Sequence, residues 1–263
     1  MCRFAAYVGP PVPLSALLYD PPTCLSEQAV RPREQCSGRI NVDGTGVAWW
    51  DGKDPRPLRY RTERPPWADE NLRGLAPRLA GTVQLAAVRS ASLGIPYGAP
   101  FAHPFVHGAV AGTHNGWISA FRPLLARRLL ALLPDHLFGA FDGMSDSLAL
   151  FLLAVAELER NPAGGLVGAV EAALAATAEE CRRAGATAIL NLALADTWGV
   201  AISRMGCKES GSSLYVLRGS ARWPSANLVA SEPLDDDPGW TPVPDRHIAA
   251  VTGDGITVTP IPD

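Results

Sequence analysis

The sequence predicts an α+β fold in which two antiparallel sheets pack face to face and helices cover them. One observation is the order of patterns: strand-length apolar segments come first, long helical patterns follow, and short β-rich segments end the chain. The other is that 24 prolines and 25 glycines are spread over 263 residues without a repeat or a low-complexity linker. We therefore expect residues 1–263 to form one domain.

The first part of the chain predicts strands and then helices. Apolar runs of strand length occupy Phe4–Val8, Gly46–Trp50, Leu85–Val88 and Ala109–Ala111. Apolar residues recur with a helical period at Asn71–Leu79, Phe121–Leu133, Asp146–Glu159 and Leu166–Arg183. Ser145 precedes the third helical pattern as an N-cap, and Gly185 follows the fourth as a C-cap.

After Gly185 the pattern changes to short β-rich segments separated by turn-forming residues. The expected strands are Thr187–Leu194, Gly199–Ser203, Leu214–Leu217, Leu228–Ala230 and Ile256–Thr259. The expected turns are Asp196–Thr197, Met205–Gly211 and Gly253–Gly255. This meander supplies the remaining strands of the two sheets.

Composition excludes several classes of protein. Hydrophobic residues make up 47% and charged residues 19%, which is typical of a globular protein. The net charge is −3 and the sequence has no basic stripe, so we expect neither a nucleic-acid nor a membrane partner. A homo-oligomer is one alternative for the assembly state. The five cysteines form no CxxC pair, residues 4–19 lack the features of a signal peptide, and no apolar helical run is long enough to cross a membrane. A reduced, cytoplasmic protein is the expectation.

Cys2 is the first residue that can carry chemistry. Removal of Met1 would leave a cysteine with both a thiol and a free α-amine. Because an α-amine has a pKa of about 7.7–8.0, it can take up the thiol proton and return it to a leaving amine. One residue would then act as nucleophile and base. Taken alone, an incidental terminal cysteine is the simpler interpretation.

Two later positions offer charges that suit a zwitterionic ligand. Arg89 ends an apolar run and can present a guanidinium to a carboxylate, with Ser92 close behind it. Asp146 stands in the first turn of a predicted helix, where a carboxylate can hold an ammonium or simply stabilise the helix. An ordinary surface arginine and a helix cap are the structural alternatives.

Asn115-Gly116 follows the apolar stretch that begins at Ala109. The pair is typical of a hairpin turn. It also suits an oxyanion hole, in which the Asn115 amide and the Gly116 backbone N–H donate to one oxygen. The turn is the simpler interpretation for this pair alone.

The order of these elements is more specific than any one of them. Met1-Cys2, Arg89, Asn115-Gly116 and Asp146 follow one another as in the class II glutamine amidotransferases, which the chain resembles over nearly its whole length. The resemblance implies an N-terminal-nucleophile hydrolase fold, a four-layer αββα sandwich. It also implies that the enzyme hydrolyses a γ-glutamyl amide.

The resemblance further assigns a role to each residue. It makes Cys2 the nucleophile, with its α-amine as base, and makes Asn115 and Gly116 the oxyanion hole. Arg89 and Ser92 would bind the α-carboxylate of the glutamyl group, and Asp146 its α-ammonium. No metal or cofactor is expected: His103 and His107 lie four apart, but Pro104 breaks the helical spacing and no glutamate completes an HExxH motif.

Finer motifs resemble the ergothioneine-pathway amidohydrolases, which remove glutamate from γ-glutamyl-hercynylcysteine S-oxide. These motifs are Met1–Arg3, Asn41–Gly46, Ala87–Ala91, Ala230–Pro233, Asp235–Trp240 and Pro244–His247. The sequence shows no P-loop or GxGxxG for a synthetase. A glutaminase subunit that supplies ammonia to a separate synthetase is the alternative, and a non-enzymatic γ-glutamyl-binding protein is a third.

The substrate of those amidohydrolases also carries a quaternary ammonium. Aromatic faces and carboxylates bind such a group, so Trp49, Trp50, Trp240 and Asp43 are candidates. Packing of these tryptophans in the core is the more common arrangement. His114, beside Asn115, is expected to be a structural hydrogen-bonding residue.

Overall fold

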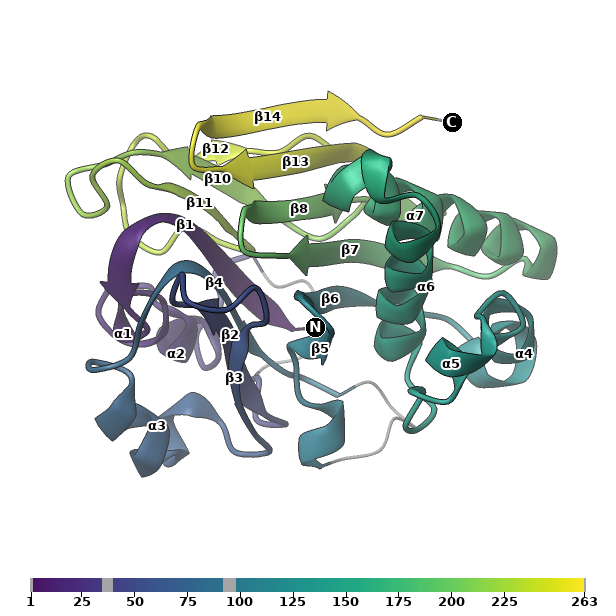
Figure 1. Ribbon diagram of the computed structural model, residues 1–263, viewed down its shortest axis with the longest axis horizontal. Coiled ribbons are helices and arrows are strands. Elements are labelled where there is room, and N and C mark those ends of the chain that lie inside the picture. The colour runs from purple at the N-terminus through teal and green to yellow at the C-terminus, as the bar shows by residue number, and fades with distance from the viewer. Residues whose placement is uncertain (1, 35–39, 92–97, 263) are drawn as a thin grey trace.

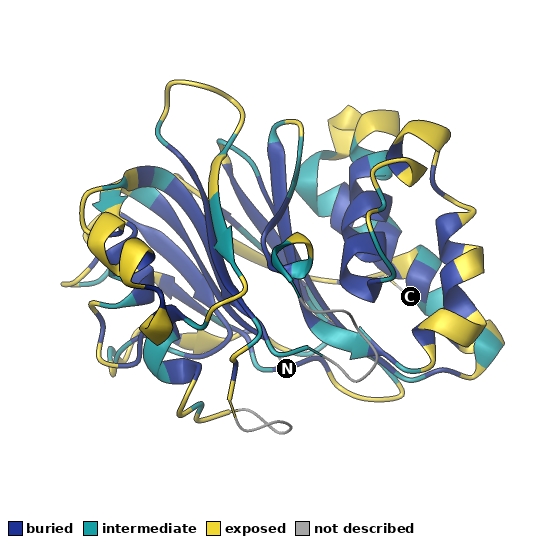
Figure 2. Cartoon of the chain, turned by 90° about the horizontal axis from the view of Figure 1, so that it is seen from below, coloured by how far each residue is buried: buried dark blue, intermediate teal, exposed yellow. Residues whose placement is uncertain are grey.

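The computed structural model describes residues 2–34, 40–91 and 98–262. Two antiparallel sheets pack face to face, and helices cover the outer face of each, so the layers follow the αββα order predicted from the sequence (Figures 1 and 2). None of the described helices is long and apolar enough to cross a membrane.

The first sheet brings three distant segments to one end. Over the described residues its strand order is β12-β10-β11-β1-β4-β2-β3. The bounds are β1 Arg3–Pro13, β2 Thr45–Trp50, β3 Leu58–Thr62, β4 Ala80–Val88, β10 Tyr215–Arg218, β11 Asn227–Ala230 and β12 Thr241–Pro242. In the middle of the sheet Arg3 pairs with Val88 and Ala5 pairs with Ala230. The start of β1 therefore meets the ends of β4 and β11.

The second sheet has the described order β14-β13-β8-β7-β6-β5, and β9 also pairs with β7. The bounds are β5 Phe105–His107, β6 Val110–Ile118, β7 Ala188–Ala195, β8 Gly199–Arg204, β9 Gly206–Cys207, β13 His247–Thr252 and β14 Gly255–Pro260. The β5 strand pairs with β6 only over Val110–Gly112. The rest of that edge of β6 lies beyond the end of β5.

Three layers of apolar side chains hold the sandwich together. Alternate residues of β1 divide between two of them: Phe4 and Ala6 pack between the sheets, whereas Ala5 and Tyr7 pack under the short helices. Those helices are α1 Ser15–Leu18, α2 Leu25–Gln28 and α3 Glu70–Leu75. The third layer lies between the second sheet and α4 Ala126–Leu130, α5 Asp135–Phe138, α6 Asp146–Arg160 and α7 Gly165–Ala184.

The long helices match the sequence prediction closely. In α6 ten consecutive residues from Asp146 to Val155 are buried, because α6 packs against both the second sheet and α7. The Ser145 side chain caps α6 by accepting the Leu148 N–H, and Gly185 ends α7 with a positive φ of 66°. Both predicted caps are confirmed.

Two predicted helices are shorter or less regular than expected, each beside a proline. The helix expected over Asn71–Leu79 ends at Leu75, and Pro77 lacks the N–H that would extend it. The helix expected over Phe121–Leu133 begins as a π-helical turn, Phe121–Leu125, that contains Pro123, and α4 then ends at Leu130.

Candidate active site

Cys2 precedes the central strand of the first sheet. The residue is 6% exposed, and Sγ lies 3.8 Å from the carbonyl oxygen of Ser90. Side chains alternate along β1, so Cys2 shares the face of Phe4, which packs between the sheets. The thiol is therefore directed into the space between the two sheets, next to the segment that follows β4.

Arg89 is buried and directly follows β4, and both its backbone N–H and its carbonyl oxygen are hydrogen-bonded. Its N–H donates to the Gly44 carbonyl oxygen at 2.8 Å, and its own carbonyl accepts the Asp43 N–H at 3.0 Å. The Asp43 carboxylate accepts the Ala91 N–H at 2.7 Å. Asp43 and Gly44 thus fix the segment that places Arg89 beside Cys2, while Ser92 lies outside the described residues.

The three tryptophans considered for quaternary-ammonium binding are buried, and Asp43 has a structural contact. The carboxylate of Asp43 holds the Ala91 backbone. Trp49 and Trp240 pack under the short helices, and Trp50 packs between the sheets. The indole N–H of Trp50 donates to Pro55 O at 2.9 Å, and that of Trp240 donates to Asp235 Oδ1 at 2.9 Å. The prediction of a ligand site on these rings is wrong, and the packing interpretation is right.

Asn115 and Gly116 lie inside a strand, so the hairpin-turn interpretation of this pair is wrong. The β6 strand continues to Ile118, and neither residue has a positive φ. A Cβ on Gly116 would overlap the Ile189 carbonyl oxygen of β7. Only glycine therefore allows the two strands to approach this closely.

The register of β6 decides where the Gly116 N–H points. The Ser119 N–H donates to Thr187 O on the β7 side. Backbone groups alternate between the two edges of an antiparallel strand, so Gly116 and Ile118 present theirs to the opposite edge. The Ile118 N–H there donates to Asp146 Oδ2 at 3.0 Å. The Gly116 N–H faces the same edge, beyond the end of β5.

Asp146 is a buried carboxylate at the start of α6. Oδ2 accepts the Ile118 N–H, and Oδ1 accepts the Ser147 N–H at 2.8 Å. Each carboxylate oxygen can accept a further hydrogen bond. The helix N-terminus and these two donors stabilise a negative charge on Asp146, which suits the binding of an ammonium group.

His114 is buried beside Asp146 and has both ring nitrogens engaged. Nε2–H donates to the Ile189 carbonyl oxygen at 2.9 Å, so Nδ1 accepts from the Ser147 hydroxyl at 3.0 Å. Burial lowers the pKa of His114 below 6.5, although the Asp146 carboxylate opposes the shift. His114 is thus a neutral hydrogen-bonding residue, as predicted.

His103 contacts the second sheet and lies near enough to Arg89 to feel its charge. It is fully buried, and its Nδ1 lies 2.9 Å from Thr113 Oγ1. Burial lowers its pKa well below 6.5, and the Arg89 guanidinium adds to the shift. His103 therefore stays neutral, and Arg89 provides the positive charge. Among the described residues, no three histidine, cysteine or acidic side chains gather to hold a metal ion.

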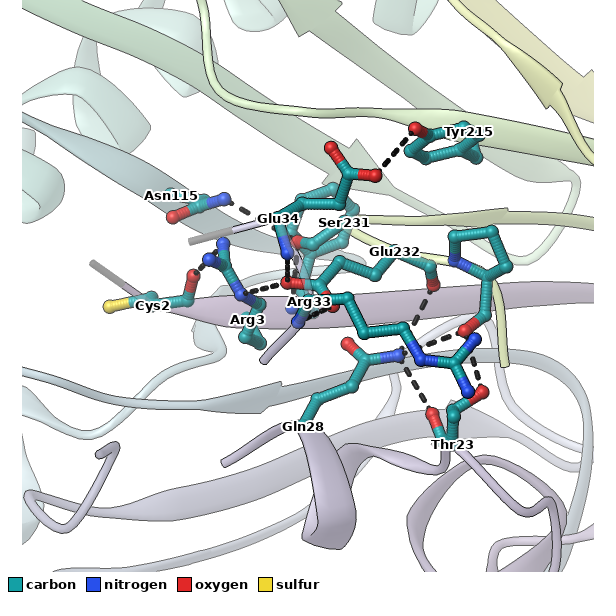
Figure 3. Close-up of polar contacts among 12 residues, drawn as sticks. Cys2, Arg3, Thr23, Gln28, Arg33, Glu34, Asn115, Tyr215, Ser231 and Glu232 are labelled. Atoms are coloured by element: carbon teal, nitrogen blue, oxygen red, sulfur yellow. Dashed lines mark hydrogen bonds and ion pairs between the residues drawn. The ribbon is translucent and has the colours of Figure 1, made fainter. Parts of the chain in front are cut away.

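Ser231 and Glu232 follow β11, and their side chains bind the first residues of β1 (Figure 3). Ser231 Oγ accepts the Phe4 N–H at 3.1 Å and the Asn115 Nδ2–H at 3.4 Å. The Glu232 carboxylate pairs with Arg3 at 3.0 Å and accepts the backbone N–H groups of Arg33 and Glu34.

Arg3 in turn donates to the Cys2 carbonyl oxygen at 3.2 Å, so Glu232 supports the backbone of Cys2 through Arg3. The sequence marked Ala230–Pro233 only as a family motif. Its structural role was missed because the contacts span more than 100 residues along the chain.

Comparisons with known proteins agree with this arrangement. No protein-family model matches the chain. A gamma-glutamyl-hercynylcysteine sulfoxide hydrolase of Mycobacterium tuberculosis is 35% identical over 98% of this chain and 96% of its own. One of Mycolicibacterium smegmatis is 34% identical over 99% of this chain and 100% of its own. The chain belongs to the gamma-glutamyl-hercynylcysteine sulfoxide hydrolase family.

Solved structures relate this hydrolase family to the class II glutamine amidotransferases. A glutamine aminotransferase class-II domain protein from Silicibacter pomeroyi has a TM-score of 0.74 and 25% identity, and each chain is fully covered. The Bacillus subtilis glutamine phosphoribosylpyrophosphate amidotransferase has a TM-score of 0.64 at 15% identity, over 99% of this chain and 49% of its own, which supports the fold alone. The chain is an amidohydrolase with the predicted N-terminal-nucleophile fold.

Proposed function

We propose that this amidohydrolase releases glutamate from γ-glutamyl-hercynylcysteine S-oxide through a thioester on Cys2. The observation that carries the proposal is the convergence of Cys2, Arg89 and the Asn115-Gly116 pair at one end of the two sheets. The mycobacterial relatives, which match almost the whole chain, are named for this substrate. A cytoplasmic location remains a prediction.

The mechanism assigns one task to each residue. After removal of Met1, the Cys2 α-amine takes the thiol proton and the thiolate attacks the γ-carbonyl carbon. Asn115 and the Gly116 N–H stabilise the oxyanion that forms. The C–N bond then breaks, and the leaving amine takes the proton from the α-ammonium. Water hydrolyses the resulting thioester by the same route and releases glutamate.

Arg89 and Asp146 recognise the amino-acid end of the glutamyl group. Arg89 is a buried cation beside a neutral His103, which suits an α-carboxylate. Asp146 is a buried anion on the same edge of β6 as Gly116, which suits an α-ammonium. The two charges select a γ-glutamyl group over an amide that lacks either one. Ser92 is proposed to assist Arg89.

The test measures glutamate released from γ-glutamyl-hercynylcysteine S-oxide and, separately, from glutamine. We expect fast release from the sulfoxide, slow release from glutamine and none by a Cys2→Ala variant. Mass spectrometry of the active protein should show that Met1 is absent. Preference for glutamine would favour the alternative, a glutaminase subunit with a separate synthetase. Full activity with Met1 retained would contradict the role of the α-amine.

A further inference from the structure

The Asn115 carboxamide has one atom without a hydrogen bond. Nδ2 donates to Ser231 Oγ at 3.4 Å, which is long for a hydrogen bond, and Oδ1 has no hydrogen-bond partner among the described residues. Figure 3 shows Nδ2 turned toward Ser231 and Oδ1 turned to the side on which Cys2 lies. Asn115 and Ser231 are both fully buried. A buried acceptor without a donor loses its hydration and gains no bond in return.

The Ser231 hydroxyl, in contrast, is a donor without an acceptor among the described residues. It carries one proton and two lone pairs. Phe4 N–H and Asn115 Nδ2–H both donate to it, so both lone pairs are used. Within the described part of the chain, the hydroxyl proton then has no acceptor. Asn115 Oδ1 and the Ser231 hydroxyl proton are thus both without a partner, although the two side chains are in contact.

Rotation of the carboxamide by about 180° exchanges two groups of nearly the same size, gives both Oδ1 and the hydroxyl proton a partner, and leaves Nδ2 as the group free to donate. The Ser231 hydroxyl then donates to Asn115 Oδ1 and still accepts the Phe4 N–H. Nδ2 then faces the side of Cys2, where an oxyanion donor is needed. We propose that Ser231 is a positioning residue whose hydroxyl proton holds the Asn115 carboxamide with Nδ2 toward the reacting carbonyl.

This role rests on the proposed function, since the direction of Nδ2 matters only where an oxyanion forms. It predicts that Ser231 acts through Asn115 and not through Cys2. Without the hydroxyl, nothing among the described contacts distinguishes the two orientations of the amide. The lost interaction belongs to the transition state, so kcat should fall while KM stays nearly unchanged.

A double-mutant cycle tests this coupling with γ-glutamyl-hercynylcysteine S-oxide as substrate. We expect Asn115→Ala to lower kcat by about 100-fold or more, and Ser231→Ala by about tenfold or more, with KM within about twofold. In the Asn115→Ala background, Ser231→Ala should lower kcat by less than about twofold further. Effects that multiply would overturn the proposal. Ser213→Ala is the matched control, because that buried hydroxyl has no hydrogen-bond partner in the described chain.

The alkylation rate of Cys2 distinguishes a loss of Asn115 orientation from a displacement of the Cys2 thiol. Ser231→Ala also removes the acceptor of the Phe4 N–H, two residues from Cys2. The rate of Cys2 carboxamidomethylation by iodoacetamide, followed by peptide mass spectrometry, should match the wild-type rate within about twofold, because the thiol and its base do not involve Asn115. A rate that falls in parallel with kcat would show that Ser231 acts through Cys2, and would overturn the proposal.

Neutron diffraction tests the orientation without any measurement of activity. Crystals of the wild-type protein exchanged into D2O should show the Ser231 deuteron directed at Asn115 and the amide deuterons directed toward Cys2. Amide deuterons directed at Ser231 Oγ would overturn the proposal. A wild-type protein that shows the expected deuterons but hydrolyses no γ-glutamyl compound would instead contradict the proposed function.

Discussion

At the scale of the residue, Asp146 combines a structural task with a proposed recognition task. Its carboxylate accepts two backbone N–H groups, from Ile118 and Ser147. Asn at this position keeps the shape and one acceptor but loses the charge. We expect Asp146→Asn to raise KM for the γ-glutamyl substrate by about 10-fold or more, because a buried charge pair is lost.

The matching measurement uses a glutaryl amide, which lacks the α-ammonium. The wild-type enzyme should prefer the γ-glutamyl compound, and the Asp146→Asn variant should lose most of that preference. An unchanged preference would show that another group binds the ammonium.

The sequence alone predicted part of the candidate site. Cys2, Arg89, Asn115, Gly116 and Asp146 were predicted as site residues from their order along the chain, and the structure brings these residues to one end of the sandwich. Asp43 was one candidate for binding a quaternary ammonium, whereas the structure shows its Oδ2 holding the Ala91 backbone. A local pattern identifies a residue type that suits a task, whereas the partner that occupies it is set by tertiary contacts.

At the scale of the element, β6 depends on the absence of a side chain at Gly116. A Cβ there would overlap the Ile189 carbonyl oxygen, which belongs to the backbone of β7 and cannot turn aside. We expect Gly116→Ala to lower the free energy of unfolding by about 1–3 kcal/mol or more, as overpacking does, and to abolish activity. Urea denaturation measures the first effect.

Gly168→Ala in α7 is the matched control. A Cβ at that position meets nothing within 4 Å, and the residue lies inside a helix. The substitution should raise the free energy of unfolding by about 0.5–1 kcal/mol, because alanine loses less conformational entropy than glycine. Equal effects at the two glycines would contradict the close packing of β6 on β7.

The elements that sequence reasoning missed depend on pairing rather than on local pattern. The β13 strand, His247–Thr252, was not predicted, although its neighbour β14 was. Each residue of β13 pairs with β8 on one side and with β14 on the other. A short strand of this kind is stabilised by cross-strand contacts, which a single-sequence pattern does not contain. The long helices α6 and α7 carry their own apolar stripe and caps, so they were predicted well.

At the scale of the whole molecule, two buried neutral histidines make stability depend on pH. His103 and His114 have pKa values below the 6.5 of an unfolded histidine, because both are buried. Below pH 6.5 the unfolded chain therefore binds protons that the native protein does not. The stability is fully present above pH 6.5 and is lost as the pH falls toward the lower native pKa, by up to about 1.4 kcal/mol per pH unit for each histidine.

Urea denaturation at pH 7.5 and pH 5.5 checks this expectation, since carboxylates remain mostly ionised over that range. The wild-type protein should lose about 1 kcal/mol for each of the two histidines. His114→Gln keeps a donor for the Ile189 carbonyl but cannot be protonated, so its loss between the two pH values should be smaller by about half. Because each protein's free energy of unfolding is compared between the two pH values, the stability lost through the substitution itself cancels. An undiminished loss would mean that His114 is protonated in the native protein, which would place a positive charge beside Asp146 and weaken its attraction for an ammonium.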